Sequence, residues 1–350
     1  MTSQSQGPKN SFLPWVEMSR LVAQIGFFSS TFFCYIFIML TLLGMKKRFG
    51  SYTYLLVTFS SFGILFASCE FILYPNVHSY NAGYFFYSTS RPFNTGKEAV
   101  TLCITAYTGV YASTISMLSV QFIYRYWAIF HTRKLRMFKG WWILLWTGYC
   151  SYFGVQWALG IYFLDKADEF TSEYLGGSLR ENYNLDIEEL AGVAVVMYSN
   201  DNSLRIRNLL GLANMSFIMT VQYIIIIYCA VMMYQYMDEH LQLMSESKRR
   251  LHNQFYKTLV LQIFTPTVCL FLPVIAIIYM PLLNLELNLP TGTVLCAITL
   301  YPAMDAIICM IIVTDYRKVT QKFLVKLLEE ISKWFSISER EQPSRTEESD

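Results

Sequence analysis

Charged residues are scarce in this chain of 350 residues: they make up 15% of it, whereas 54% of the residues are hydrophobic. A soluble domain needs a larger charged share to cover its surface, so this composition excludes an ordinary water-soluble fold. Apolar windows of about 20 residues, the length that crosses a bilayer core, recur along the chain. We therefore predict an all-α membrane protein, a bundle of seven transmembrane helices at about 21–43, 52–74, 99–123, 141–164, 209–236, 258–283 and 292–314.

Catalytic and metal-binding patterns are also lacking. The four histidines, His78, His131, His240 and His252, lie in loops or at span ends, and no Glu/His spacing indicates a metal site. Because Asp305 is the only deep acid, no Ser/His/Asp set can be assembled inside the bundle. The chain has neither a Gly-rich phosphate loop nor a compact basic domain. We therefore expect no enzymatic activity, no metal or cofactor, and no nucleic-acid partner.

No cysteine lies in a predicted loop, because all eight fall inside the spans. This placement excludes a framework of loop disulfides, and a buried free cysteine usually behaves as a small hydrophobic residue. Cys69 and Cys103 lie near the outer ends of consecutive helices, so they are the one pair worth testing for a bridge.

The positive charges are unevenly distributed. Lys and Arg number 19 in the segments that follow odd-numbered spans, including the tail, and 8 in the other segments. Positive charge marks the cytoplasmic side, so the tail lies inside and residues 1–20 lie outside. Those first residues lack the apolar core of a signal peptide. We expect the first span to act as its own insertion signal, held by Lys46, Lys47 and Arg48.

Two segments outside the spans carry distinct patterns. Residues 165–208 form the one long outer connection, a candidate lid, and the run from Asp186 to Val196 fits either a hairpin or a short helix. Residues 315–335 combine an aliphatic stripe with lysines at helical spacing, which fits an amphipathic helix on inner-leaflet lipids or one docked on protein. Residues 336–350 are polar, and we expect disorder there.

Polar residues inside the spans are candidates for function, because burying them in hydrocarbon is costly. Glu70, about one turn below the outer end of its span, could meet a ligand or a partner such as a tyrosine hydroxyl or Arg91. The alternative is a snorkelling or hydrogen-bonded structural carboxylate. Tyr107 and Tyr111 share one helix face in the outer half. If polar faces turn inward, Asn214 and Tyr279 complete an aromatic-walled pocket for a small, largely uncharged ligand.

Candidate switch residues lie in the sixth and seventh spans. Pro266, Pro273 and Pro302 each remove a backbone hydrogen bond and bend their helix, which permits rigid-body swings. Asp305 lies three residues after Pro302 in the inner half of its span. It is too deep to touch most ligands, so we interpret it as part of a polar switch.

The inner ends of the spans form a basic surface. Arg125 and Tyr126, at the end of the third span, face the same compartment as Arg249 and Arg250 in the loop before the sixth span. These four residues fit a contact surface for a protein partner, although arginines at helix ends often serve only as membrane anchors.

Several short motifs, in their order and spacing, carry a resemblance over nearly the whole chain. They are Gly50-Ser51-Tyr52, Glu70-Phe71 with Pro75 and His78, Tyr124-Arg125-Tyr126, Asn208-Leu209-Leu210-Gly211, Leu261-Gln262 with Pro266 and Pro273, Leu300-Tyr301-Pro302 with Asp305, and Asp315-Tyr316-Arg317. Together they resemble the nematode seven-transmembrane chemoreceptors of the Str type. Ala306 is one departure, since the family often carries proline at this position.

The resemblance implies an odorant or pheromone receptor in the plasma membrane of sensory cilia. It also implies that a heterotrimeric G protein is the partner of Arg125, Tyr126, Arg249 and Arg250. Unlike rhodopsin-like receptors, the chain has no acid before Arg125 and no cysteine in the long outer loop. A ligand-gated channel subunit and a transporter are the alternatives, but pore-lining charges are few and seven spans do not form two equal halves.

The charge distribution makes a topological prediction. Residues 165–208 should be reachable from outside intact cells and residues 237–257 should not, because positive loops stay in the cytoplasm. Introduced cysteines labelled with a membrane-impermeant reagent measure this directly. The reverse labelling pattern would overturn the orientation.

Overall fold

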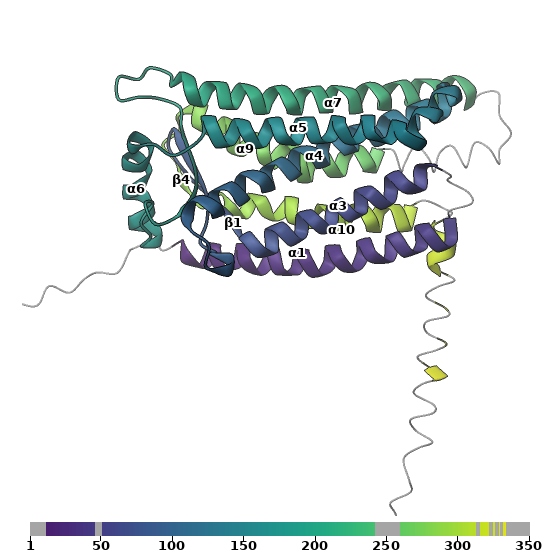
Figure 1. Cartoon of the computed structure of the whole chain (residues 1–350), viewed down its shortest axis with the longest axis horizontal. Coiled ribbons are helices and arrows are strands. Elements are labelled where there is room, and N and C mark those ends of the chain that lie inside the picture. The colour runs from purple at the N-terminus through teal and green to yellow at the C-terminus, as the bar shows by residue number, and fades with distance from the viewer. Residues whose placement is uncertain are drawn as a thin grey trace, which may run out of the picture.

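The computed structural model describes residues 12–45, 51–241, 260–312 and 316–321, together with 325, 329, 332 and 333. Long helices run side by side, and a small β-sheet with one further helix closes one end of the bundle (Figure 1). We call this the capped end and the other the opposite end. The predicted contacts Arg249 and Arg250, residues 336–350 and most of 315–335 lie outside the described residues.

The long helices are α1 (Leu13–Leu40), α3 (Ser51–Leu73), α4 (Lys97–Phe130), α5 (Ile143–Leu164), α7 (Ile206–Leu241) and α10 (Gly292–Ile312). A further helical segment, Val260–Leu283, contains α9 (Leu272–Tyr279); we call Val260–Leu283 the sixth helix. In the described part of the chain, six helices are long and apolar enough to cross a membrane. Of the seven predicted spans, α5 is the one that does not meet this condition. It carries no charged side chain, but its tryptophan, tyrosine and glycine residues lower its mean hydropathy.

Helix α4 occupies the centre of the bundle. It contacts α3, α5 and α7 and reaches the sheet at the capped end, and Figure 1 shows it crossing the bundle obliquely. Its residues from Tyr111 to Phe122 are all buried. Close approach to α5 depends on Gly109, because a Cβ there would lie 2.8 Å from the carbonyl oxygen of Gly154. The helix continues to Phe130, beyond the predicted span 99–123.

Proline shapes two of the helices differently. Pro266 and Pro273 flank a π-helical turn, Thr267–Phe271, which makes the sixth helix irregular near its middle. Pro302 lies inside α10, which continues through it from Gly292 to Ile312. The irregular turn thus lies in the sixth helix, between two of the three prolines.

A four-stranded antiparallel sheet covers the capped end, in the order β3-β2-β1-β4. Its strands come from all three connections at that end: β1 (Pro75–Tyr80), β2 (Gly83–Ser88), β3 (Ala191–Val196) and β4 (Asn288–Leu289). The all-α prediction lacked this sheet. The run before Val196 forms neither of the predicted alternatives, since it is a strand paired with a different connection.

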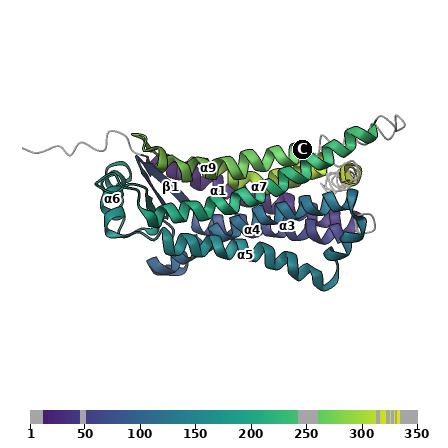
Figure 2. The same cartoon turned by 90° about the horizontal axis from the view of Figure 1, so that it is seen from above.

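Both faces of the sheet are buried. Tyr84 and Phe86 face the bundle and belong to its main core, whereas Phe85 and Tyr87 face α6 (Glu169–Tyr183). Figure 2 shows α6 beyond the ends of the long helices, on the outer side of the sheet. Alternation along β2 thus supplies apolar side chains to two layers at once.

His78 of β1 ties the sheet to α6. Its ring is fully buried, with Nε2 2.9 Å from the hydroxyl of Ser178 and Nδ1 3.2 Å from that of Tyr183. Burial lowers the pKa of His78 to about 4, so the ring is neutral in the folded cap at neutral pH. Asp165, at the end of α5, shows the opposite effect, because burial raises the pKa of its carboxyl to about 7.

We expect acid to weaken the cap through His78. An unfolded histidine titrates near pH 6.5, so the unfolded state binds the proton first and stability falls as pH drops from about 6.5 towards 4. Between pH 7 and 4.5 the parent should lose about 1–3 kcal/mol relative to His78→Gln, measured by thermal unfolding. Titration of Asp165 raises the stability as pH falls, but it does so equally in parent and variant. Its contribution therefore cancels when the two free energies of unfolding are compared. If the stability of parent and variant fell by the same amount between pH 7 and 4.5, the effect of His78 would be refuted.

Candidate ligand-binding site

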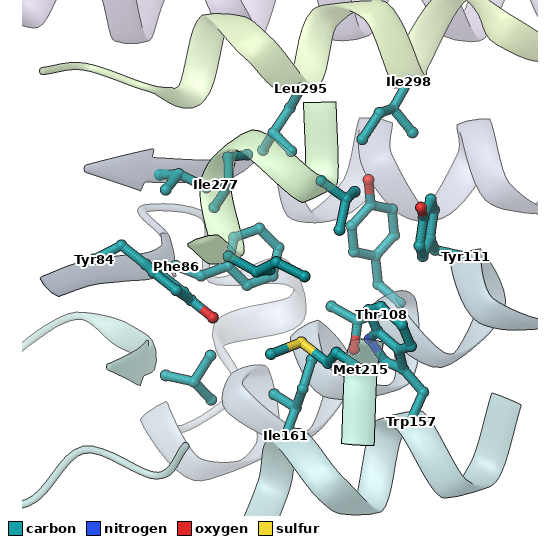
Figure 3. Close-up of a pocket in the computed structure, with 15 residues that line it drawn as sticks. Tyr84, Phe86, Thr108, Tyr111, Trp157, Ile161, Met215, Ile277, Leu295 and Ile298 are labelled. Atoms are coloured by element: carbon teal, nitrogen blue, oxygen red, sulfur yellow. The ribbon is translucent and has the colours of Figure 1, made fainter. Parts of the chain in front are cut away.

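A cavity lies inside the bundle, beneath the sheet (Figure 3). About 580 Å³ of space free of protein atoms lies among its lining residues, part of it open to the surroundings. The sheet, α4, α5, α7, α9 and α10 all contribute to its walls, through Val77, Tyr84, Phe86, Tyr107, Thr108, Tyr111, Trp157, Ile161, Val193, Met215, Val274, Ile277, Ile278, Leu295 and Ile298.

The walls are aromatic and aliphatic. None of the described side chains that line the cavity is charged. The hydrogen-bonding hydroxyl groups come from Thr108 and three tyrosines, and Trp157 adds a ring N–H. Trp157 meets the ring of Tyr111 edge-on at 5.6 Å, and Phe86 stacks at 6.4 Å from Tyr107. Because an unpaired charge is costly in such surroundings, the cavity suits a small, largely uncharged ligand with few polar groups.

Two of the five predicted ligand contacts line the cavity. Tyr107 and Tyr111 share one wall, on the face of α4 expected from their spacing. Glu70, Asn214 and Tyr279 are not among the lining residues. The cavity thus brings together two of the five residues, and the role of each of the five as a ligand contact stays a prediction.

Each of these three polar residues is instead bonded to a neighbouring helix. Glu70 accepts a hydrogen bond from Thr299 in a separate small gap, which shares only Leu295 with the cavity. Asn214 accepts one from Gln156 of α5 at 2.9 Å. The hydroxyl of Tyr279 lies 2.7 Å from that of Ser216 on α7. Polar side chains in a membrane bundle often form hydrogen bonds to neighbouring helices. Such a side chain faces the bundle interior without facing a pocket.

The cavity residues that sequence reasoning missed are mostly aliphatic or belong to the sheet. Ile277 and Ile298 are aliphatic, as lipid-facing side chains are, so the sequence does not distinguish residues that line the cavity from residues that face lipid. The aromatic run from Tyr84 to Tyr87, after a turn at Asn81 with positive φ, could have indicated the hairpin.

Tyr111 connects the cavity to the sixth helix. Its hydroxyl donates a hydrogen bond of 3.0 Å to the carbonyl oxygen of Leu270, inside the π-helical turn. Backbone bonding is irregular there because of the wide turn and because Pro273 has no N–H. A cavity side chain thus holds the sixth helix at its most irregular point.

A second link to the sixth helix lies near the opposite end. Arg125 donates to the hydroxyl of Tyr52 at 2.7 Å and to the side-chain oxygen of Gln262. Gln262 in turn donates to the sulfur of Cys309 on α10 at 3.3 Å. Arg125 was predicted at the end of its helix, but it is partly buried within α4 and joins four helices.

The other predicted inner residues have distinct surroundings. Tyr126 packs against Tyr228 of α7, with ring centroids 6.0 Å apart. Asp305 is partly buried in α10 and lines a small gap together with Cys34 and Tyr301. Among the described residues, no group of three or more His, Cys, Asp or Glu is arranged to hold a metal ion, and all eight cysteines are free. Cys69 and Cys103 are therefore not bridged.

Known proteins resemble this chain over most of its length. The profile of the family described as "Serpentine type 7TM GPCR chemoreceptor Str" matches residues 19–321. The chain is 32% identical to "G-protein coupled receptor str-33" of Caenorhabditis elegans over 315 residues, 88% of this chain and 91% of that one. It is 32% identical to "Serpentine receptor class r-10" of the same organism over 297 residues, 83% and 87% of the two chains.

Proposed function

Because the chain belongs to the Str-type serpentine seven-transmembrane chemoreceptors, we propose that it detects a small, largely uncharged ligand in the cavity and activates a heterotrimeric G protein at the opposite end. The family is one of receptors, and the chain is a multi-pass membrane protein. Its membership does not favour the ion-channel and transporter alternatives. An odorant or pheromone as ligand, and a plasma-membrane site in the sensory cilium, are part of the proposal.

The observation that carries the proposal is the hydrogen bond from Tyr111 to the Leu270 carbonyl. Its donor belongs to the cavity wall and its acceptor to the irregular turn of the sixth helix. A ligand with a carbonyl or ether oxygen would compete for the Tyr111 proton. Only such a difference in contacts between two states allows a ligand to shift their populations.

The irregular turn provides the hinge in this mechanism. Once Tyr111 is released from Leu270, the segment between Pro266 and the opposite end swings away from α4. The link between Arg125 and Gln262 then separates, because its two members lie on the fixed and the moving helix. Arg125 and Tyr126 become accessible in the cleft that opens.

The G protein is proposed to enter this cleft. Arg125 and Tyr126 would meet it from α4, and Arg249 and Arg250 from the loop that leads into the sixth helix. Positive side chains at this end suit an acidic partner surface. Pro302 and Asp305 of α10 line the path of the movement, next to Tyr301 and the gap around it.

Tyr111→Phe tests the coupling between the cavity and the sixth helix. Removing one hydrogen bond costs about 0.5–1.5 kcal/mol, so signalling without ligand should rise roughly two- to tenfold as the active state gains population. The measurement is basal G-protein activity in cells, corrected for surface expression. Tyr107→Phe is the matched control, because the Tyr107 hydroxyl, one turn away, has no hydrogen bond within the described chain. Equal basal activity in both variants would reject the coupling.

Reversing two charges tests the G-protein contact. Arg249→Glu combined with Arg250→Glu should abolish ligand-stimulated activation, because it replaces attraction with repulsion at the partner surface. Binding of ligand to the cavity should be unchanged, because neither arginine is among the proposed ligand contacts. Normal activation in the double variant would mean that the two arginines serve only as membrane anchors.

A further inference from the structure

The sheet closes the cavity at the capped end. Val77, Tyr84, Phe86 and Val193 form its roof, and each side chain is buried. Helix α6 covers the other face of the same sheet. A ligand arriving from the aqueous phase at this end would have to separate hydrogen-bonded strands from different connections, so direct passage through the roof is unfavourable.

The flank between α7 and α9 has a different construction. Two hydroxyl contacts bridge α7 and the sixth helix: Ser216 with Tyr279 of α9 at 2.7 Å, and Tyr223 with Thr267 of the π-helical turn at 3.4 Å. Ser216 and Tyr223 are about two turns, or 10 Å, apart along α7. The cavity residue Met215 precedes Ser216 at one end of this interval, so the two contacts frame a stretch of flank next to the cavity.

The cavity approaches the bilayer at this flank. Every lining residue is buried except Thr108 and Val274, which are partly exposed. Val274 precedes Ile275, which is 39% exposed, and the ring of Tyr279 one turn further on is 38% exposed. These exposed side chains lie on the outer surface of the bundle, and the cavity residues Val274 and Met215 adjoin Ile275 and Ser216 in sequence at this flank.

The Ser216–Tyr279 contact is a single hydrogen bond of known direction. The Ser216 hydroxyl also lies 2.7 Å from the carbonyl oxygen of Leu212, which can only accept. The Ser216 hydroxyl therefore donates its hydrogen bond to the Leu212 carbonyl and accepts one from the Tyr279 hydroxyl. One exposed hydrogen bond is weak enough to open and close often.

We propose that ligands reach the cavity sideways from the bilayer, between α7 and α9, and that the Ser216–Tyr279 pair controls this passage. The inference rests on the proposed function and deepens it by naming the ligand class. The ligand is an uncharged molecule that dissolves in the membrane before it binds. Charged or strongly hydrated molecules are excluded at the first step, because their transfer into hydrocarbon is costly.

Thiol labelling tests the route without knowledge of the ligand. Thr108→Cys places a reactive group in the cavity wall with little change in size. The receptor is embedded in phosphatidylcholine nanodiscs and treated with N-phenylmaleimide, an uncharged probe that partitions into lipid. Labelling of the introduced thiol is followed by peptide mass spectrometry, which separates it from the native cysteines.

Two changes at the flank should alter the labelling rate in opposite directions. Tyr279→Ala removes the hydrogen bond and should speed labelling about two- to tenfold. Ser216→Trp places a bulky indole between α7 and α9 and should slow labelling by a similar factor. Phe217→Trp is the matched control, because Phe217 is 56% exposed on α7 and takes no part in the Ser216–Tyr279 contact. The control should label at the parent rate.

A disulfide across the roof tests the competing route. Ser88 and Ala191 are direct partners in the β2–β3 register, so Ser88→Cys with Ala191→Cys fastens the sheet without touching the flank. The fastened protein should label at the parent rate. Slower labelling after fastening, or unchanged labelling in both Tyr279→Ala and Ser216→Trp, would overturn the route. A chain that labels as expected but activates no G protein would contradict the proposed function alone, since labelling needs no agonist.

Discussion

The burial of α4 at the centre of the bundle is the constraint on which the rest of the structure depends. A helix surrounded by others in a bilayer must find partners for its polar side chains among its neighbours. Tyr111 and Arg125 satisfy this demand by bonding to the sixth helix, near the cavity and near the opposite end. They are separated by nearly four turns, about 20 Å, and therefore point to similar sides of α4. One rigid element thus holds a proline-flanked neighbour at two distant points.

The predicted seven-transmembrane bundle and the Str-type resemblance are confirmed. Hydropathy predicted the bundle because each crossing requires a long apolar run, a local property of the chain. The β1–β2 hairpin left a local signal, but the pairing of β2 with β3, a strand about a hundred residues later, could not be predicted because pairing partners leave little trace in one sequence. Tyr107 and Tyr111 could be placed by helical spacing, whereas the partner of Asn214 depends on how α5 and α7 rotate against each other.

The cap shows how an outer surface can be ordered without loop disulfides. Its cohesion comes from strand pairing, from aromatic packing of Phe85 and Tyr87 under α6, and from the bonds of His78. The capping box between Asp168 and Thr171 starts α6 at a fixed position. A cavity roofed in this way has walls that keep their shape, which favours recognition by size and shape over recognition by charge.

The order of strands also constrains how the protein is made. The β1–β2 hairpin follows the second span during synthesis, but its neighbours β3 and β4 emerge only after the fourth and sixth spans. Until then the hairpin presents two unpaired edges, which are liable to join other chains. Since β4 immediately precedes α10, the roof is completed only when nearly every span has been inserted. The finished sheet can thus exist only in a chain in which nearly all the helices are already in place.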